Sequence, residues 1–374
     1  MKMEVQGPMK KRIFLSPPYV GAPERKAVME AFDTGYIAPC GPMVDLFEKR
    51  LAEISSRKFA VAVSSTTAAI DLMMEEFGVG EGWTLVAPSL TFIATVGPAW
   101  RRGAKINFAD SDLTANADLK CLAKALDAAK GKKMVIGVDL YGRCCNYNAL
   151  ERLCAEKNAV LLMDSAEAVG SFSGSRPAGS AGVAGLYSFN GNKIVTTSGG
   201  GAILTDDGEL ASRARSRSQQ SREPVLWYEH REVGFNCRMS NILAAIGVAQ
   251  LGRIGGILAK RAAIAAEYEK EFSLSRAVKP LKKVKGANNW LNVVFLRNGV
   301  LRDAAIKALD AENIEARPVW KPMHMQKVFE SCAFFGSGVS EDMFERGVCL
   351  PSGTGMTLSQ VRRVARIVKE VAEG

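Results

Sequence analysis

The sequence predicts an α/β protein whose large domain carries a mostly parallel, seven-stranded sheet between helices, followed by a smaller α+β domain. Short apolar runs, often β-branched, recur through the first part of the chain, and helical patterns separate most of them. After about Met239 the residue composition changes, and an Ala- and Ile-rich stretch with a helical pattern begins. We therefore expect a disordered basic leader over residues 1–12, the large domain over residues 13–250 and the small domain over residues 251–374.

Seven apolar runs are the predicted strands of the large sheet. Each is short and apolar, as strands buried on both faces should be. They are Phe59–Val63, Thr84–Ala87, Lys105–Ala109, Met134–Leu140, Ala159–Asp164, Gly185–Phe189 and Gly201–Thr205. Helical patterns between them, such as Thr67–Phe77 and Tyr147–Lys157, predict parallel neighbours.

The last third of the chain begins with a long helical stretch, which we expect to break at Gly255 and Gly256 because glycine is a poor helix former. A strand is predicted over Asn292–Leu296, a helix from Arg302 and a last helix from Leu358. These elements suit a small α+β domain joined to the large one by a long helix.

The composition indicates a protein without a membrane span. Of 374 residues, 47% are hydrophobic and 24% are charged, and no run approaches the roughly 18 apolar residues that a span requires. The net charge of +10 is spread along the chain without a nucleic-acid-binding motif, so we expect a surface that attracts anionic small molecules. Eight cysteines without a C-x-x-C pair, and only two histidines, form no metal site and are typical of reduced thiols in the cytoplasm.

Lys193 stands alone among small and polar residues in the stretch YSFNGNKIVTTSGGG, residues 187–201. A phosphate-binding Walker A loop would need G-K-[ST], whereas the order here is G-N-K-I, so that interpretation fails. A plain surface lysine is also disfavoured, because this one follows a predicted buried strand and precedes a turn of small residues. Such crowding favours a ligand that approaches the backbone, and an amine that acts as a nucleophile.

A lysine that holds pyridoxal phosphate needs an acid to keep the pyridine nitrogen protonated, so that the ring can act as an electron sink. Asp164 fits, because it ends an apolar strand, where an unpaired carboxylate would be costly. The segment SSTTAA, residues 64–69, follows a strand and opens a helix, which is either an anion site for the phosphate or a plain helix cap. Ser188 is a second candidate donor.

Taken together, the segments around these residues resemble the DegT/DnrJ/EryC1/StrS family, and the likeness runs from about Phe14 through nearly the whole chain. The matching segments are DSAEAVGS from Asp164, YSFNGNK with its TTSGGG tail, GFNCRMSNILAAIGVAQL (Gly234–Leu251), GYIAPCGPMVDLFE (Gly35–Glu48), RPVWKPMH (Arg317–His324) and CLPSGTGM (Cys349–Met356). Members of the family are fold-type I, pyridoxal phosphate-dependent aminotransferases acting on nucleotide-linked keto sugars. Within it, the sequence is most similar to the C4 aminotransferases of the UDP-N,N′-diacetylbacillosamine pathway.

The resemblance implies a role for each cofactor residue. Lys193 would bind the cofactor covalently and then move a proton, and Asp164 would pair with the pyridinium. The other implied contacts are ring stacking by Phe92, phosphate binding by Thr66, Thr67 and Ser188, and a position near the phenolic oxygen for Glu167, where many relatives have Gln or His. SSTT departs from the commoner N-S-G-T form, which favours backbone over side-chain contacts there.

The resemblance also implies substrate contacts and a homodimer. Asn236 would reach the phosphate from the neighbouring subunit, giving shared active sites. Arg238 would bind a carboxylate or diphosphate, or else form a structural ion pair. His230 and His324 would line the sugar site or simply pack, and Trp320 and Tyr36 would contact the nucleotide sugar.

The implied reaction moves the amino group of L-glutamate, with release of 2-oxoglutarate, to C4 of UDP-4-keto-6-deoxy-N-acetylglucosamine, giving UDP-4-amino-4,6-dideoxy-N-acetylglucosamine for glycan biosynthesis. One alternative is another keto sugar, such as GDP-4-keto-6-deoxymannose in a perosamine synthase, or a C3 ketone. A sugar 3-dehydratase of the same fold is disfavoured, because those relatives carry histidine in place of Lys193. A non-catalytic nucleotide-binding or regulatory protein is disfavoured, because both Lys193 and Asp164 are present.

Overall fold

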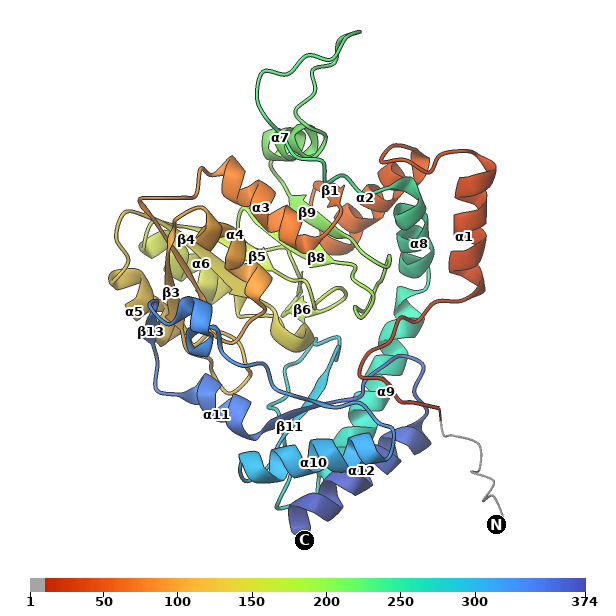
Figure 1. Ribbon diagram of the computed structural model, residues 1–374, viewed down its shortest axis with the longest axis vertical. Helices are drawn as coiled ribbons and strands as arrows, with labels where there is room; N and C mark the ends of the chain where they lie inside the picture. Colours follow the sequence, from red (N-terminus) through yellow and green to blue (C-terminus); the bar gives the residue numbers. More distant parts are fainter. Residues whose placement is uncertain (1–10) are drawn as a thin grey trace, which may run out of the picture.

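The computed structural model describes residues 11–374 and is built around an eight-stranded sheet with the order β1-β9-β8-β5-β4-β2-β3-β13 (Figure 1). From β13 to β8 neighbouring strands are parallel, whereas β9 is antiparallel to both of its neighbours. The strands are β1 (Phe59–Val63), β2 (Trp83–Pro88), β3 (Lys105–Ala109), β4 (Lys132–Val138), β5 (Ala159–Asp164), β8 (Ala184–Ser188), β9 (Gly201–Thr205) and β13 (Ala333–Phe335). The seven predicted strands are confirmed, and β13 is an addition from the C-terminal part.

Helices cover both faces of this sheet, because alternate strand residues point to opposite sides. In β1, Ala60 and Ala62 belong to one apolar cluster, and Val61 and Val63 to the other. The first cluster includes residues from α2 (Pro42–Ser55), α5 (Leu119–Asp127) and α6 (Tyr147–Glu156). The second includes residues from α3 (Thr66–Glu76), α4 (Gly97–Arg101) and α7 (Gly208–Ser218). This places the start of α3 beside the ends of the central strands.

The C-terminal part has its own antiparallel sheet, in the order β10-β11-β14-β12. Its strands are β10 (Lys279–Pro280), β11 (Asn292–Phe295), β12 (Arg317–Pro318) and β14 (Gly347–Leu350). A third apolar cluster joins this sheet to α9 (Ile254–Phe272), α10 (Gly299–Ala311) and α12 (Leu358–Glu373), while α11 (Val339–Arg346) precedes β14. The predicted domain boundary at residue 250 stays a prediction.

The N-terminal segment is tied to both parts of the molecule. Helix α1 (Ala22–Asp33) packs against α8 (Asn241–Leu251), and Ile13 pairs with Ile314 in a short parallel bridge. Of the leader predicted over residues 1–12, residues 1–10 lie outside the described part of the chain. Within the described part, Arg12 donates to the carboxylate of Asp310 at 2.9 Å.

The predicted helix break at Gly255 and Gly256 is wrong. Helix α8 ends at Leu251 and α9 begins at Ile254, so both glycines lie in the first turn of α9. The cost of glycine in a helix is measured in the interior and comes from backbone entropy, so it is smaller in the first turn. The turn occurs at Arg253 instead, where an ion pair with the buried Glu24 at 2.8 Å holds the chain.

In residues 11–374, no single helix has the length and apolar character to cross a membrane; α8 and α9 would meet both criteria together, but their axes are bent by 63°.

Between α7 and α8, a segment that we call the arm, residues 222–233, projects away from the body (Figure 1). Its side chains include Leu226, Trp227 and Tyr228, which are 99%, 63% and 79% exposed.

Candidate active site

A cavity of about 240 Å³ lies where β4, β5 and β8 end and α3 begins. Ligand sites of α/β sheets are found at the carboxyl ends of the strands. Eight of the residues predicted from the sequence line it, namely Thr66, Thr67, Phe92, Asp164, Glu167, Ser188, Lys193 and Trp320. Trp290 and Trp320 reach it from the C-terminal part, so both parts of the chain build the cavity.

Lys193 follows β8 and presents its amine between an acid and an aromatic ring. Its Nζ lies 3.1 Å from Oε1 of Glu167 and 4.2 Å from the centre of the Trp290 ring. The indole N–H of Trp290 donates to the carbonyl of Asn192 at 2.7 Å, so the ring is fixed to the lysine loop. The side chain of Lys193 is 12% exposed, which leaves its amine in the cavity but largely shielded from water.

Glu167 has partners on both carboxylate oxygens. Oε1 accepts from Lys193, and Oε2 accepts from the backbone N–H of Tyr141 at 2.7 Å. Burial raises the pKa of Glu167, and the charge of Lys193 and the hydrogen bond from Tyr141 oppose that rise. A carboxylate at this position is therefore paired within the chain.

Asp164 ends β5 and is also buried. Its Oδ2 accepts from the hydroxyl of Thr95 at 2.8 Å, and its Oδ1 accepts from the N–H of Ala166 at 3.2 Å. Burial raises the pKa of Asp164, while the hydrogen bonds from Thr95 and Ala166 and the charge of Lys193 oppose the rise. Each oxygen keeps acceptor capacity for a further donor in the cavity.

A polar network behind the cavity holds the ends of β4 and β5 together. Asp139 accepts from the hydroxyls of Tyr147 and Ser165, each at 2.5 Å, and its N–H donates to the carbonyl of Asp164 at 3.0 Å. Complete burial raises the pKa of Asp139 to about 6. The backbone that carries Asp164 is therefore anchored to its neighbouring strand beyond the ladder itself.

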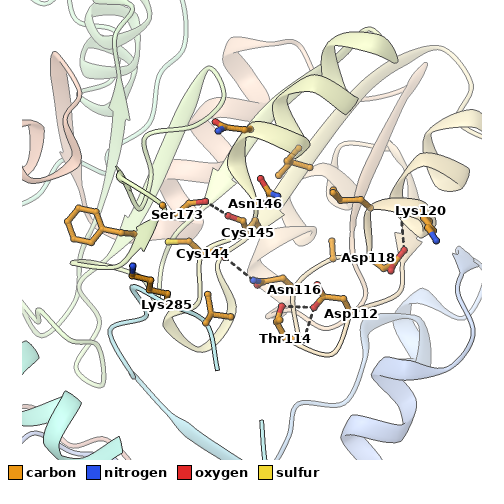
Figure 2. A pocket seen from close by; sticks show the side chains of 17 residues that line it. Asp112, Thr114, Asn116, Asp118, Lys120, Cys144, Cys145, Asn146, Ser173 and Lys285 are labelled. Atoms are coloured by element: carbon orange, nitrogen blue, oxygen red, sulfur yellow. Dashed lines mark hydrogen bonds between the residues drawn. The ribbon is translucent and has the colours of Figure 1, made fainter. Parts of the chain in front are cut away.

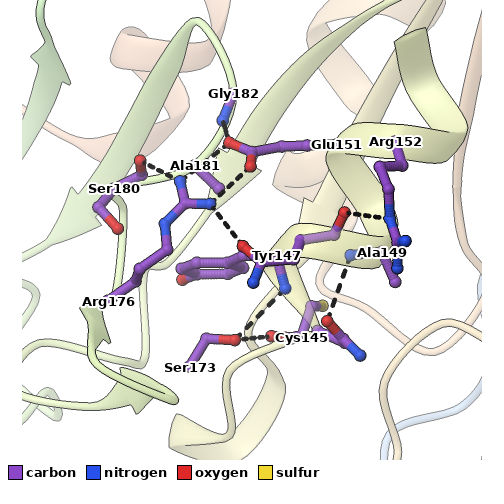
Figure 3. Close-up of polar contacts among 12 residues, drawn as sticks. Cys145, Tyr147, Ala149, Glu151, Arg152, Ser173, Arg176, Ser180, Ala181 and Gly182 are labelled. Carbon is purple, nitrogen blue, oxygen red and sulfur yellow. Dashed lines mark hydrogen bonds and ion pairs between the residues drawn. The ribbon is translucent and has the colours of Figure 1, made fainter.

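The outer part of this network fixes Tyr147 from the surface side (Figure 3). Arg176, in the hairpin of β6 (Phe172–Ser173) and β7 (Arg176–Pro177), pairs with Glu151 at 2.5 Å and 2.9 Å and lies 5.6 Å over the Tyr147 ring. The N–H of Tyr147 donates to Ser173 at 3.3 Å. The hairpin is thus bound to α6, whose first residue supports Asp139.

The start of α3 directs unpaired backbone N–H groups toward the cavity, as a helix start that binds an anion would. Ser65 caps the helix by accepting from the N–H of Ala68 at 3.1 Å. The N–H groups of Thr66 and Thr67 belong to the first turn and therefore have no intrahelical partners. The hydroxyl of Thr66 is engaged with the carbonyl of Tyr187 at 2.9 Å. The available donors at this end are therefore the backbone N–H groups and the hydroxyls of Thr67 and Ser188.

Glycine is required next to this helix start. A Cβ atom at Gly201 would lie 2.4 Å from the backbone nitrogen of Thr66 and 2.5 Å from the carbonyl carbon of Ser65. At Gly200, where φ is +155°, a Cβ would lie 2.4 Å from Met239. The glycines after Lys193 therefore let β9 approach the start of α3.

The structure places five predicted residues outside the cavity. The guanidinium of Arg238 pairs with the buried Glu48, which is the structural alternative. His324 lies between Ser89 Oγ at 2.6 Å and Glu341 Oε1 at 2.8 Å, with its ring stacked on Phe334. The remaining three are exposed: Tyr36, Asn236 and His230, which lies on the arm.

Three residues of the site were missed in the sequence. Trp290 resembles a core aromatic just before a strand, and Tyr141 contributes a backbone N–H, which no side-chain pattern reports. Thr95 was detectable in principle, because Thr91 and Thr95 flank the predicted stacking residue Phe92 in SLTFIAT. Their contacts to Lys193, Glu167 and Asp164 join segments far apart in the chain.

A second cavity, of about 680 Å³, lies between the starts of α5 and α6 (Figure 2). Its acidic side chains are engaged locally, since Asp118 caps α5 and Asp112 accepts from Thr114 at 2.5 Å. Across residues 11–374, none of the predicted site residues lines this cavity.

The first cavity contains the chemical groups that binding of pyridoxal phosphate requires. Lys193 offers an amine, Asp164 a buried carboxylate, and the start of α3 a cluster of free N–H groups. The close approach of Gly201 to that helix start shapes the cradle from the other side. These residues fit the cofactor in charge and in chemistry.

Comparison with known proteins points the same way. A sequence model of the DegT/DnrJ/EryC1/StrS aminotransferase family matches residues 18–369. EpsN of Bacillus subtilis (strain 168), provisionally named a pyridoxal phosphate-dependent aminotransferase, is 39% identical over 371 residues, which cover 96% of each chain. A GDP-perosamine synthase of Caulobacter vibrioides is 35% identical over 366 residues, covering 96% of this chain and 98% of its own. Spr1654 of Streptococcus pneumoniae, provisionally named a sugar aminotransferase and solved in its PLP-form, superposes with a TM-score of 0.89 at 25% identity, covering 97% of this chain and 99% of its own.

We expect Gly201→Ala to weaken the binding of pyridoxal phosphate by at least about tenfold, because the new methyl group displaces the start of α3. The measurement is a titration of the cofactor-free protein, followed by visible absorbance. Gly255→Ala is the matched control, since no atom lies within 4 Å of a Cβ there. Unchanged affinity of Gly201→Ala would contradict the assignment of this helix start.

Proposed function

This chain belongs to the DegT/DnrJ/EryC1/StrS aminotransferase family, and on that premise we propose that it transfers the amino group of L-glutamate to C4 of a nucleotide-linked 4-keto-6-deoxy sugar. The protein is a pyridoxal phosphate-dependent sugar aminotransferase. The observation that carries the cofactor chemistry of this proposal is that Lys193, Asp164 and the start of α3 share one cavity.

The residues that would hold the cofactor divide by chemistry. The carboxylate of Asp164 would keep the pyridine nitrogen protonated, and Phe92 would cover the ring. The N–H groups of Thr66 and Thr67, with the hydroxyls of Thr67 and Ser188, would bind the phosphate. When bound, pyridoxal phosphate supplies an electron sink and carries the amino group between the two substrates.

Lys193 would hold the cofactor through its amine and, when that amine is free, would move the proton that transamination requires. A free amine can accept a proton only in its neutral form. Glu167 lies at 3.1 Å and can take the proton of the ammonium onto Oε1, and burial raises the pKa of Glu167. Trp290 restricts the freed side chain to the cavity. The pair therefore exchanges one proton within the site.

Two acceptor sugars are supported by different observations. The segments quoted above favour UDP-4-keto-6-deoxy-N-acetylglucosamine, with UDP-4-amino-4,6-dideoxy-N-acetylglucosamine as product. The GDP-perosamine synthase at 35% identity favours a GDP-linked sugar as the second candidate. Trp320, whose ring centre lies 5.8 Å from that of Phe92, offers an aromatic surface for either sugar beside the cofactor ring.

The exposed residues support a homodimer with shared active sites. Asn236 lies outside the cavity of its own chain and is exposed, so it is free to complete the phosphate site of a second copy. The arm carries Leu226 and Trp227 in exposed positions that a partner subunit would cover. His230 and Tyr36 would then approach the partner's sugar site.

All eight cysteines are free thiols, which supports a cytoplasmic location.

We expect purified protein to aminate a 4-keto-6-deoxy sugar with L-glutamate as donor, and Lys193→Ala to lose this activity by more than about a thousandfold. The UDP- and GDP-linked sugars are supplied in separate reactions, and the amino sugar is detected by mass spectrometry. Lys283→Ala is the control, because Lys283 is exposed and pairs with Glu269. Turnover by Lys193→Ala at the wild-type rate would refute the proposal, and product from the GDP sugar alone would select the second candidate.

Shared active sites predict complementation between two inactive variants. Asn236→Asp would place a carboxylate beside the partner's phosphate, and Lys193→Ala would remove the amine. A mixed dimer has one site that lacks both residues and one intact site, so re-annealing equal amounts should restore about a quarter of wild-type activity. A mixture as inactive as its components would place Asn236 and Lys193 of one chain in the same site.

A further inference from the structure

Two threonine hydroxyls are connected in series to Asp164. Oγ1 of Thr95 donates to Oδ2 of Asp164 at 2.8 Å, and Oγ1 of Thr91 lies 2.8 Å from Oγ1 of Thr95. All three residues are buried, with exposures of 1% for Thr91, 0% for Thr95 and 7% for Asp164. The chain of hydrogen bonds therefore lies inside the protein, at the wall of the cavity.

The direction of these hydrogen bonds follows from the proton count. A threonine hydroxyl carries one proton and can donate only once. Because the proton of Thr95 goes to the carboxylate, the hydroxyl of Thr91 must be the donor to Thr95. Each donation polarises the next, so the series is strongest when Asp164 is ionised.

The segment that carries the two threonines is anchored at its start. The hydroxyl of Ser89 bonds His324 Nδ1 at 2.6 Å, and the carbonyl of Ser89 accepts from the N–H of Met323 at 2.7 Å. The turn η1 (Ile93–Thr95) ends the segment at the carboxylate. Phe92 lies between the two threonines, so one short segment sets both the aromatic ring and the partner of Asp164.

We propose that Thr95, supported by Thr91, is a positioning residue that keeps Asp164 oriented and charged for the pyridine nitrogen of the cofactor, an inference that rests on the proposed function. Burial alone would favour the neutral acid, which cannot pair with a pyridinium. The hydrogen bond from Thr95 lowers the pKa of Asp164 against that effect. Loss of the hydroxyl should therefore weaken the cofactor's hold without removing any group that touches it.

The test measures binding of pyridoxamine phosphate, which forms no bond to Lys193, to the wild-type protein, Thr95→Val, Thr95→Ser and Thr91→Val. Quenching of the fluorescence of Trp290 and Trp320 reports binding across a pH series. We expect Thr95→Val to weaken binding about tenfold to a hundredfold, because a hydrogen bond to a charged group is lost. Thr95→Ser should stay within about threefold of the wild type, and Thr91→Val should fall between them.

The pH profile separates this role from simple packing. Without the Thr95 hydroxyl the pKa of Asp164 rises, so the acid becomes neutral at a higher pH. As pH falls, the loss of affinity should therefore begin at a higher pH in Thr95→Val than in the wild type. Thr205→Val is the matched control, since Thr205 is equally buried and donates to the carbonyl of Val183 far from the cavity.

Two results would overturn the inference. The first is an affinity and pH profile of Thr95→Val equal to those of the wild type. The second is a loss in Thr95→Ser as large as in Thr95→Val, which would assign the effect to the methyl group. If Thr95→Val does not fold, Thr91→Val is the deciding variant. An affinity and a pH profile of Thr91→Val equal to those of the wild type would refute the role of the hydrogen-bonded series. Failure of the wild-type protein itself to bind pyridoxamine phosphate would refute the proposed function, whereas normal wild-type binding with unaffected variants would refute only the role of Thr95.

Discussion

The site depends on one constraint, which is that an amine and two carboxyl groups lie buried in one small cavity, where every charge needs a partner from the chain. Lys193 and Glu167 form an ion pair at 3.1 Å, and Asp164 lies in the same cavity. Buried charges are stable only when partners and hydrogen bonds compensate for lost hydration. The surrounding structure supplies those partners from several directions: Tyr141 to Glu167, Thr95 and Ala166 to Asp164, and the face of Trp290 to Lys193.

The fold explains why these partners can meet. Parallel strands deliver Asp164 and Ser188 to the same edge of the sheet, where α3 begins. The glycines after Lys193 allow β9 to approach that helix start closely. The C-terminal part then closes the cavity with Trp290 and Trp320. The large part therefore supplies the polar groups of the cavity, and the C-terminal part supplies two aromatic side chains of its wall.

Local patterns in the sequence predicted seven of the eight strands of the large sheet and singled out Asp164 and Lys193, which the structure brings to one cavity. Asp164 and Lys193 each stand out against their neighbours, an acid at the end of an apolar strand and a lone amine before a glycine turn. The rest depends on contacts that no local pattern reports. Arg238 pairs with Glu48, which lies 190 residues away in the chain. Strand β13 has only three residues, which is too short for an alternating or apolar pattern to predict it. The predicted helix break was misplaced: the chain turns between Leu251 and Ile254, where Arg253 pairs with Glu24, and a contact so distant in the sequence leaves no local pattern.

The central claim is that Lys193 is the residue that bonds the cofactor, with Asp164 and the start of α3 as its partners in one site. The most direct measurement is reduction of the cofactor-loaded protein with sodium borohydride, followed by proteolysis and mass spectrometry of the peptides. The account predicts a single pyridoxyl group on the peptide that contains Lys193. A pyridoxyl group on another lysine, or on none, would contradict it.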